Sequence, residues 1–203
     1  MTEDAKILGR GRYLRLLARD GWEFVERTRG SGVVGIIAVT QDEDIVLVEQ
    51  YREPFQKPSV ELPAGLVGDA GLEDPLTAAM RELEEETGYT AVRWEFLFSG
   101  GSSTGLTTET IAMFLATSLQ RSSEGGGDDS EDIIVHVIPL DELDEWLAFK
   151  ASKGCIIDIK LHMALPIARA ALVDAKRRLS RCITPTTLRL PSVMAWLFCT
   201  ASS

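Results

Sequence analysis

Apolar residues along the chain recur with two periods, one typical of strands and one typical of helices. Short alternating or continuously apolar runs indicate strands that are buried on one face or on both. These runs lie at residues 11–17, 22–27, 33–39, 45–51, 92–98, 110–117 and 133–138. Helical patterns come mostly later, beginning near Pro139 and near Asp158. The pattern therefore predicts a mixed α/β fold, with many strands first and most helices late.

The clearest helix lies between Asp74 and Gly88. Asp74 is a good N-cap, Pro75 suits the first helical position, and Gly88 can adopt the left-handed conformation that ends a helix. Its apolar residues form one stripe that can pack on a core. The stripe consists of Leu76, Ala79, Met80 and Leu83.

A further helical pattern runs from about Asp158 to Leu179 and contains Pro166. Proline removes a backbone donor and clashes with the preceding turn, so we expect Pro166 to kink or split this helix. Residues 120–132 are acidic and rich in glycine, and they predict a mobile loop.

Composition narrows the possible partners. The 203 residues carry a net charge of −10, which argues against nonspecific nucleic-acid binding, although bound cations would still allow phosphate binding. No apolar run of about 18 residues and no secretory signal is visible, so we expect neither a membrane span nor export. The three cysteines form no metal spacing and no even disulfide framework, which favours a cytoplasmic protein.

The helix ends in the acidic sequence RELEEETG, residues 81–88, in which like charges lie one turn apart. On a helical wheel Glu82, Glu85 and Glu86 share an arc of roughly 100° beside the apolar stripe, whereas Glu84 points away. Three converging carboxylates suit a hard divalent cation such as Mg²⁺, with Mn²⁺ as an alternative. Arg81 is placed to pair with Glu85. The alternative interpretation is an ordinary solvated acidic face.

The spacing favours the metal site, because eight positions resemble the Nudix box of the Nudix hydrolase superfamily. They are Glu73, Arg81, Glu82, Leu83, Glu85, Glu86, Gly88 and Tyr89. The resemblance implies a Nudix-type α/β/α sandwich with a mixed sheet, and a metal-loaded site that cleaves a phosphoanhydride. Seven residues separate Gly65 from Glu73, where the family has five, which predicts a two-residue insertion in the loop before the helix.

The stretches WEFVER, LVEQYREP, ELPAG and SEDIIVHVIPLDE look like the ADP-ribose pyrophosphatase branch, over roughly residues 10–175. This resemblance implies that the Ala64 carbonyl joins Glu82, Glu85 and Glu86 as a metal ligand, and that Arg81 and Glu85 belong to the catalytic group. It places the general base in the acidic loop, at Glu131 first and at Asp129 second. A disordered loop without a role is the alternative.

The same branch implies that Trp22 stacks on adenine and that Arg27 and Arg52 contact the substrate. Glu61 and Glu109 are further candidates for the substrate site. For Trp22 and the arginines, an ordinary structural role stays open. The branch also implies a homodimer in which N-terminal strands of one subunit reach the nucleotide of the other.

The expected substrate is a nucleoside diphosphate sugar, with ADP-ribose first. Thr104 stands where ADP-ribose enzymes carry a proline, which leaves UDP- and GDP-sugars open. A noncatalytic Nudix-like nucleotide-binding module is the competing hypothesis. We expect an N-terminal β subdomain at residues 1–30, a Nudix catalytic domain at 31–180, and a tail at 181–203 whose role the sequence does not indicate.

Overall fold

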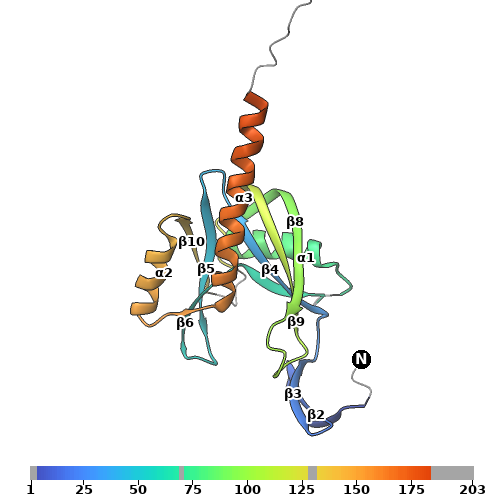
Figure 1. Cartoon of the computed structure of the whole chain (residues 1–203). Coiled ribbons are helices and arrows are strands. Elements are labelled where there is room, and N and C mark those ends of the chain that lie inside the picture. The colour runs from blue at the N-terminus through green and yellow to red at the C-terminus, as the bar shows by residue number, and fades with distance from the viewer. Residues whose placement is uncertain (1–3, 69–70, 128–131, 184–203) are drawn as a thin grey trace, which may run out of the picture.

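The computed structural model describes residues 4–68, 71–127 and 132–183 of the chain. Strands come first along the chain and most helices come late, as predicted (Figure 1). In chain order they are β1 Lys6–Arg10, β2 Leu14–Arg19, β3 Trp22–Arg27, β4 Gly32–Val39, β5 Asp44–Arg52, β6 Lys57–Glu61, β7 Ala64–Val67, α1 Pro75–Thr87, β8 Tyr89–Gly101, β9 Thr110–Arg121, β10 Ile134–Pro139, α2 Leu143–Ser152, β11 Ile156–Ile157 and α3 Ile159–Ile183.

An eight-stranded mixed sheet forms the body of the protein. Its main strand order is β11-β6-β5-β4-β9-β8, with β10 paired to β5 and β7 paired to β4. The β4–β9 and β11–β6 pairs are parallel, and the other pairs are antiparallel. The parallel pairs matter for function because they bring together segments that are far apart in sequence.

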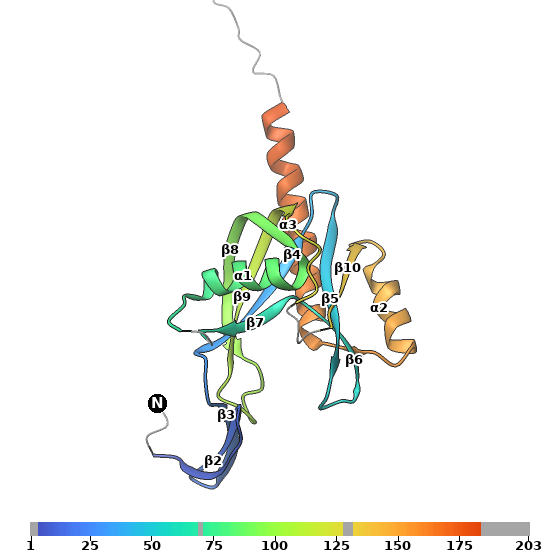
Figure 2. The same ribbon diagram turned by 180° about the vertical axis from the view of Figure 1, so that it is seen from behind.

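Each face of this sheet is covered by helix, which explains the continuously apolar strands. Successive residues of β4 point to opposite faces, so Val34 and Ile36 pack toward α1, whereas Ile37 and Val39 pack toward α2 and α3. Figures 1 and 2 show α3 and α1 on opposite sides of the sheet. The α/β/α sandwich predicted from the sequence is therefore confirmed.

A small antiparallel sheet of β1, β2 and β3 extends from the body, as expected for the N-terminal residues (Figure 2). Two backbone hydrogen bonds join it to the loop between β8 and β9. They run from the Val25 N–H to the Leu106 carbonyl at 2.8 Å and from the Thr108 N–H to the Val25 carbonyl at 3.2 Å. The loop therefore lies against β3, next to the body.

Helix α1 begins and ends where its capping residues predict. The Asp74 side chain accepts hydrogen bonds from the backbone N–H groups of Leu76 and Thr77, and Gly88 ends the helix with a φ of 71°. The predicted apolar stripe is wrong at Met80, which is 43% exposed, while Ala78 is buried. The buried arc is centred closer to Glu86 than to Leu83, so carboxylates occupy part of the face that contacts the body.

Of the two expected effects of Pro166, a kink or a split of the last helix, the split is wrong, because α3 is continuous from Ile159 to Ile183. Pro166 lies on the exposed side of α3, while Ala164 and Ala168 pack into the core. A carbonyl that loses its donor on the exposed side can bond to water instead, so the helix continues. Among the described residues, no helix combines the length and the apolar character needed to cross a membrane.

A buried carboxylate attaches α2 to the sheet. Glu49 on β5 is 9% exposed, and its Oε2 atom accepts hydrogen bonds from His136 Nε2 at 2.7 Å and from Lys150 Nζ at 2.5 Å. The His136 ring also packs edge-on against Trp146 of α2, with 4.8 Å between ring centroids. His136 is thus engaged in packing, as expected for a histidine within an apolar strand.

Desolvation raises the pKa of Glu49, but the hydrogen bonds and charges of Lys150 and His136 outweigh it, so the pKa is lowered overall. A carboxyl with a lowered pKa stabilises the fold above its unfolded pKa of about 4.3, and this stabilisation is lost as the pH falls through the folded value. We expect Glu49→Gln to reduce the free energy of unfolding by about 1–3 kcal/mol at neutral pH.

This difference between variant and wild type should shrink as the pH falls through the lowered pKa of Glu49. Urea unfolding at neutral and acidic pH measures it, with the exposed Glu145→Gln as the matched control. A difference that stays constant with pH would contradict the assignment.

Candidate active site

The acidic end of α1 presents its three glutamates to different environments. Glu86 is buried at 4% exposure, and the side chain of Glu82 is 13% exposed. The side chain of Glu85 is 55% exposed. Two of the three carboxylates therefore lie against the body, and the third lies at the edge of the site.

Arg81 holds this group of carboxylates together. Its Nε and Nη2 atoms donate to the two oxygens of Glu73 at 3.2 and 3.3 Å, and Nη1 lies 2.9 Å from both Glu82 Oε1 and Glu85 Oε2. Nη2 also donates to the Leu66 carbonyl at 3.2 Å. The hydrogen bonds that Arg81 donates to Glu73 contribute most to raising the pKa of Arg81. One guanidinium therefore bonds three carboxylates of the box, and the expected pairing with Glu85 is present.

Glu86 is tied to the turn that precedes the box. Its Oε2 atom accepts a hydrogen bond of 3.0 Å from the backbone N–H of Ala64, the first residue of β7. This contact links the C-terminal part of α1 to the ELPAG segment, 22 residues earlier in the chain. It places the Ala64 backbone next to the glutamates, as the family resemblance implies.

Gly65 leaves the space that the Glu82 carboxylate occupies. A Cβ atom at Gly65 would lie 1.8 Å from Cδ of Glu82 and 2.0 Å from its Oε1. Any side chain at position 65 would therefore displace this carboxylate. The glycine of the box is required here by the close approach of a side chain to the backbone.

The glutamates open onto a cavity of about 450 Å³, which we call the glutamate cavity. The described residues that line it are Arg27, Val33, Arg52, Glu61, Ala64, Gly65, Leu66, Glu82, Glu86, Glu109, Ile111 and Lys160. Seven of them were predicted as site residues from the sequence: Arg27, Arg52, Glu61, Ala64, Glu82, Glu86 and Glu109. Arg81 and Glu85 do not line the cavity, but Arg81 bonds Glu82 on its wall.

Two arginines of the cavity are each held by a carboxylate of the same wall. Arg52 donates from Nε and Nη2 to the two oxygens of Glu61, both at 2.7 Å, and these hydrogen bonds contribute most to raising the pKa of Arg52. Arg27 Nε lies 2.5 Å from Glu109 Oε2. Guanidinium groups fixed in this way are oriented in advance for phosphate oxygens.

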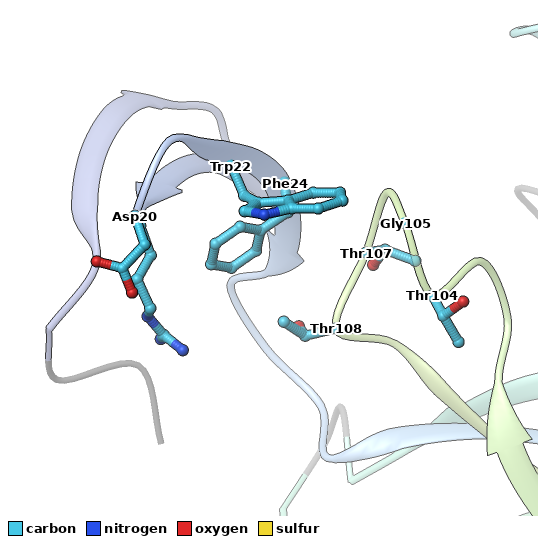
Figure 3. Close-up of a pocket in the computed structure, with 8 residues that line it drawn as sticks. Asp20, Trp22, Phe24, Thr104, Gly105, Thr107 and Thr108 are labelled. Carbon is cyan, nitrogen blue, oxygen red and sulfur yellow. The ribbon is translucent and has the colours of Figure 1, made fainter.

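Trp22 lies in a different cavity, of about 460 Å³, which we call the Trp22 cavity (Figure 3). Its lining residues come from the β2–β3 hairpin and from the loop between β8 and β9. They are Arg19, Asp20, Trp22, Phe24, Thr104, Gly105, Thr107 and Thr108. Trp22 is 68% exposed, so it is accessible to a partner. Strand β3 and this loop also supply Arg27 and Glu109 to the glutamate cavity.

Asp129 and Glu131, the candidates for the general base, lie outside the described residues. The segment just before them is attached to α1. The N–H groups of Gly126 and Gly127 donate to the carbonyls of Glu86 and Glu85, at 2.8 and 3.0 Å. Residues 126 and 127 of the predicted acidic loop are therefore attached to the C-terminal end of α1.

Two features of the glutamate cavity were not predicted from the sequence. One is the presence of Lys160, and the other is the space that Gly65 leaves for Glu82. Gly65 could have been noticed as the glycine of the box. Lys160 has no local signal, because it comes to the cavity through the parallel pairing of β11 with β6.

The donor chemistry of the site suits a hard divalent cation. The oxygens of Glu82 and Glu86 line the cavity, Gly65 leaves room for one of them, and Glu85 lies nearby through Arg81. Among the described residues, no three carboxylate, imidazole or thiol groups are arranged so that together they could hold a metal ion. The present contacts explain this, because Arg81 bonds Glu82 and Glu85 while Ala64 bonds Glu86.

Comparison with known proteins agrees with this geometry. The NUDIX domain family matches residues 30–156, and the chain belongs to this family. The protein is thus a Nudix hydrolase, and its resemblance to the ADP-ribose pyrophosphatase branch is confirmed.

Two curated relatives and one solved structure illustrate the match. A methanol dehydrogenase activator from Bacillus methanolicus is 43% identical over 140 residues, which cover 69% of this chain and 73% of the relative. An ADP-ribose pyrophosphatase from Bacillus subtilis (strain 168) is 36% identical over 109 residues, covering 54% of this chain and 58% of the relative. The crystal structure of an ADP compounds hydrolase superposes with a TM-score of 0.61 at 20% identity, covering 86% and 94% of the two chains, and supports the fold.

Gly65→Ala tests whether the position of Glu82 matters for hydrolysis. The new Cβ meets the far end of a flexible side chain, so we expect Glu82 to move with little loss of stability. A displaced carboxylate should lower kcat about a hundredfold. Steady-state kinetics and thermal unfolding measure the two effects, with Gly100→Ala as the control, since a Cβ there meets nothing within 4 Å. Unchanged kcat in Gly65→Ala would show that the position of Glu82 is not critical.

Proposed function

We propose that the protein hydrolyses the pyrophosphate bond of a nucleoside diphosphate sugar in the presence of Mg²⁺. ADP-ribose is the first candidate, and its products would be AMP and ribose 5-phosphate. The observation that carries the proposal is the glutamate cavity, where carboxylates of α1 share one wall with Arg27 and Arg52. Hydrolysis of a pyrophosphate needs both the arginines and the carboxylates. Cationic side chains must offset the charge of the phosphates, and a metal site must activate water.

The metal ligands in this proposal are Glu82, Glu85, Glu86 and the Ala64 carbonyl. A bound Mg²⁺ would neutralise charge on the phosphoryl oxygens and lower the pKa of a water molecule. Mn²⁺ is an alternative, because it also prefers oxygen ligands. Arg81 would keep Glu85 oriented, since its other bonds to Glu73 and Leu66 hold the guanidinium in place.

Glu131 is the proposed general base, with Asp129 as the second candidate. A base must reach the water that attacks phosphorus, so it has to come from a segment near the metal ligands. The hydrogen bonds of Gly126 and Gly127 to the carbonyls of Glu86 and Glu85 support this choice, because they attach this part of the acidic loop to α1.

For the nucleotide, we propose that Trp22 stacks on the base while Arg27 and Arg52 contact the phosphates. Glu61 and Glu109 would orient these arginines. The exposed Trp22 ring suits a flat purine. Thr104 lies in the Trp22 cavity, so the missing family proline affects the region proposed to hold the base. This position keeps UDP- and GDP-sugars as alternative substrates.

A homodimer is part of the same proposal. The N-terminal sheet exposes several large apolar side chains, which a second copy of the chain could cover. They include Ile7, Leu8, Tyr13, Leu14, Leu16 and Trp22. An N-terminal sheet shared between two subunits would explain how Trp22 can serve a nucleotide although it does not line the glutamate cavity of its own chain.

A second candidate function is activation of a methanol dehydrogenase. The identity of 43% to an activator of that enzyme, over 69% of this chain, favours it. Adding the purified protein to a methanol dehydrogenase tests this candidate. A faster dehydrogenase would support it, and an unchanged rate would remove it.

The main test is hydrolysis of a substrate panel with and without Mg²⁺. ADP-ribose, UDP-glucose, GDP-mannose and a diadenosine polyphosphate should be compared by the release of phosphatase-sensitive monophosphate. We expect ADP-ribose to be cleaved fastest, and only when the metal is present. Faster cleavage of a UDP- or GDP-sugar would reassign the substrate, and no cleavage of any compound would overturn the proposal.

Variants of the helix glutamates test the metal role directly. Glu85→Gln and Glu86→Gln each remove one anionic ligand, so kcat should fall by about two to three orders of magnitude. Glu84→Gln is the matched control, because Glu84 is exposed on α1 and is not among the described residues that line the glutamate cavity. Circular dichroism should show an intact fold in all three. Turnover like the wild type in either ligand variant would end the metal argument.

A further inference from the structure

Lys160 is a cavity residue that no family motif in the sequence contains. It lies in the first turn of α3 and lines the glutamate cavity together with Arg52, Glu82 and Glu86. Its position depends on the parallel pairing of β11 with β6, in which Ile157 is opposite Val60. The next residue, Asp158, donates its N–H to the Val60 carbonyl at 3.0 Å, so the chain enters α3 beside Glu61.

Asp158 holds Lys160 in a defined position. Its Oδ1 atom accepts a hydrogen bond of 2.8 Å from the Lys160 backbone N–H, and its Oδ2 atom is bonded to Lys160 Nζ. The side chain of Lys160 is 21% exposed and that of Asp158 is 17% exposed. A lysine side chain usually loses much conformational freedom when it binds a ligand, but this one is already ordered.

The charges around the cavity distinguish Lys160 from the two arginines. Arg27 and Arg52 are each bonded to a carboxylate that also lines the cavity, Glu109 and Glu61. Asp158, the partner of Lys160, is not among the described residues that line the cavity. Lys160 thus lines the cavity while its carboxylate partner does not, although the charge of Asp158 also acts on Arg52. Its ammonium group has three N–H donors, and one of them is sufficient for Asp158.

We propose that Lys160 binds a phosphoryl oxygen of the diphosphate in the substrate. The inference rests on the proposed function, because it names a further contact to the same nucleoside diphosphate. An ammonium is a compact cation that suits a phosphate oxygen without requiring the bidentate geometry of an arginine. The positive N-terminal end of α3 adds to the attraction for an anion. Lys160 would therefore help to hold the diphosphate in the cavity that Glu82 and Glu86 also line.

Lys160→Met tests this contact by removing the charge and keeping most of the side-chain volume. We expect KM for the best substrate of the panel to rise about tenfold to a hundredfold, with a much smaller change in kcat. The affinity for a nonhydrolysable α,β-methylene analogue, measured by calorimetry without turnover, should fall by a similar factor. Lys160→Arg should recover most of both losses, because it restores a cation.

Lys153→Met is the matched control, because Lys153 is an exposed lysine at the end of α2 that stacks on Phe149. It should leave KM and analogue affinity unchanged. If Lys160→Met unfolds, Lys160→Gln and Lys160→Arg provide the same comparison. A purely structural role of the Asp158 pair would appear as a lower Tm with KM and analogue affinity close to wild type, and this result would overturn the inference.

The outcomes separate the two proposals. A wild-type enzyme that cleaves no compound of the panel overturns the proposed function. If the wild-type enzyme is active, and KM and analogue affinity of Lys160→Met lie within twofold of the wild-type values, only the role of Lys160 is overturned.

Discussion

The guanidinium of Arg81 is the contact on which the acidic end of α1 depends. Glutamates one turn apart repel each other, and carboxylates in a last helical turn face the negative end of the helix dipole. Arg81 offsets both effects by bonding Glu73, Glu82 and Glu85. It also reaches the Leu66 carbonyl, so it fastens the helix to β7. One cation thus lets a helix keep an unfavourable sequence and present its carboxylates to a cavity.

The mixed sheet then decides what faces those carboxylates. The antiparallel pairing of β4 with β7 sets Ala64 and Gly65 beside α1, where they contact Glu86 and Glu82. The parallel pairing of β11 with β6 brings Lys160 to the same cavity. The β8–β9 loop, which is hydrogen bonded to β3, brings Glu109 to Arg27. Acidic and basic walls therefore come from segments that have no proximity in the sequence.

Helix α1 shows which structural features local sequence patterns can predict and which they cannot. Capping by Asp74 and Gly88 depends on residues within a few positions, and both ends are as predicted. The burial of Met80 depends on how the whole helix rotates against the sheet, and that prediction was wrong. Pro166 is a similar case, because a proline on the exposed side of a packed helix can be tolerated, and burial decides which side it takes.

The sequence by itself determined the class of the protein, the limits of helix α1, and seven of the residues that line the glutamate cavity. The helix limits and the helix glutamates follow from short-range spacing, whereas the other site residues were expected from the resemblance to the ADP-ribose pyrophosphatase branch. Only the tertiary structure decided that Trp22 and Thr104 share a separate cavity, that Gly65 makes room for Glu82, and that Lys160 joins the arginines. The physical reason is that strand pairing joins distant segments, and the packing of the sheet, not the order of the residues, sets which side chains meet.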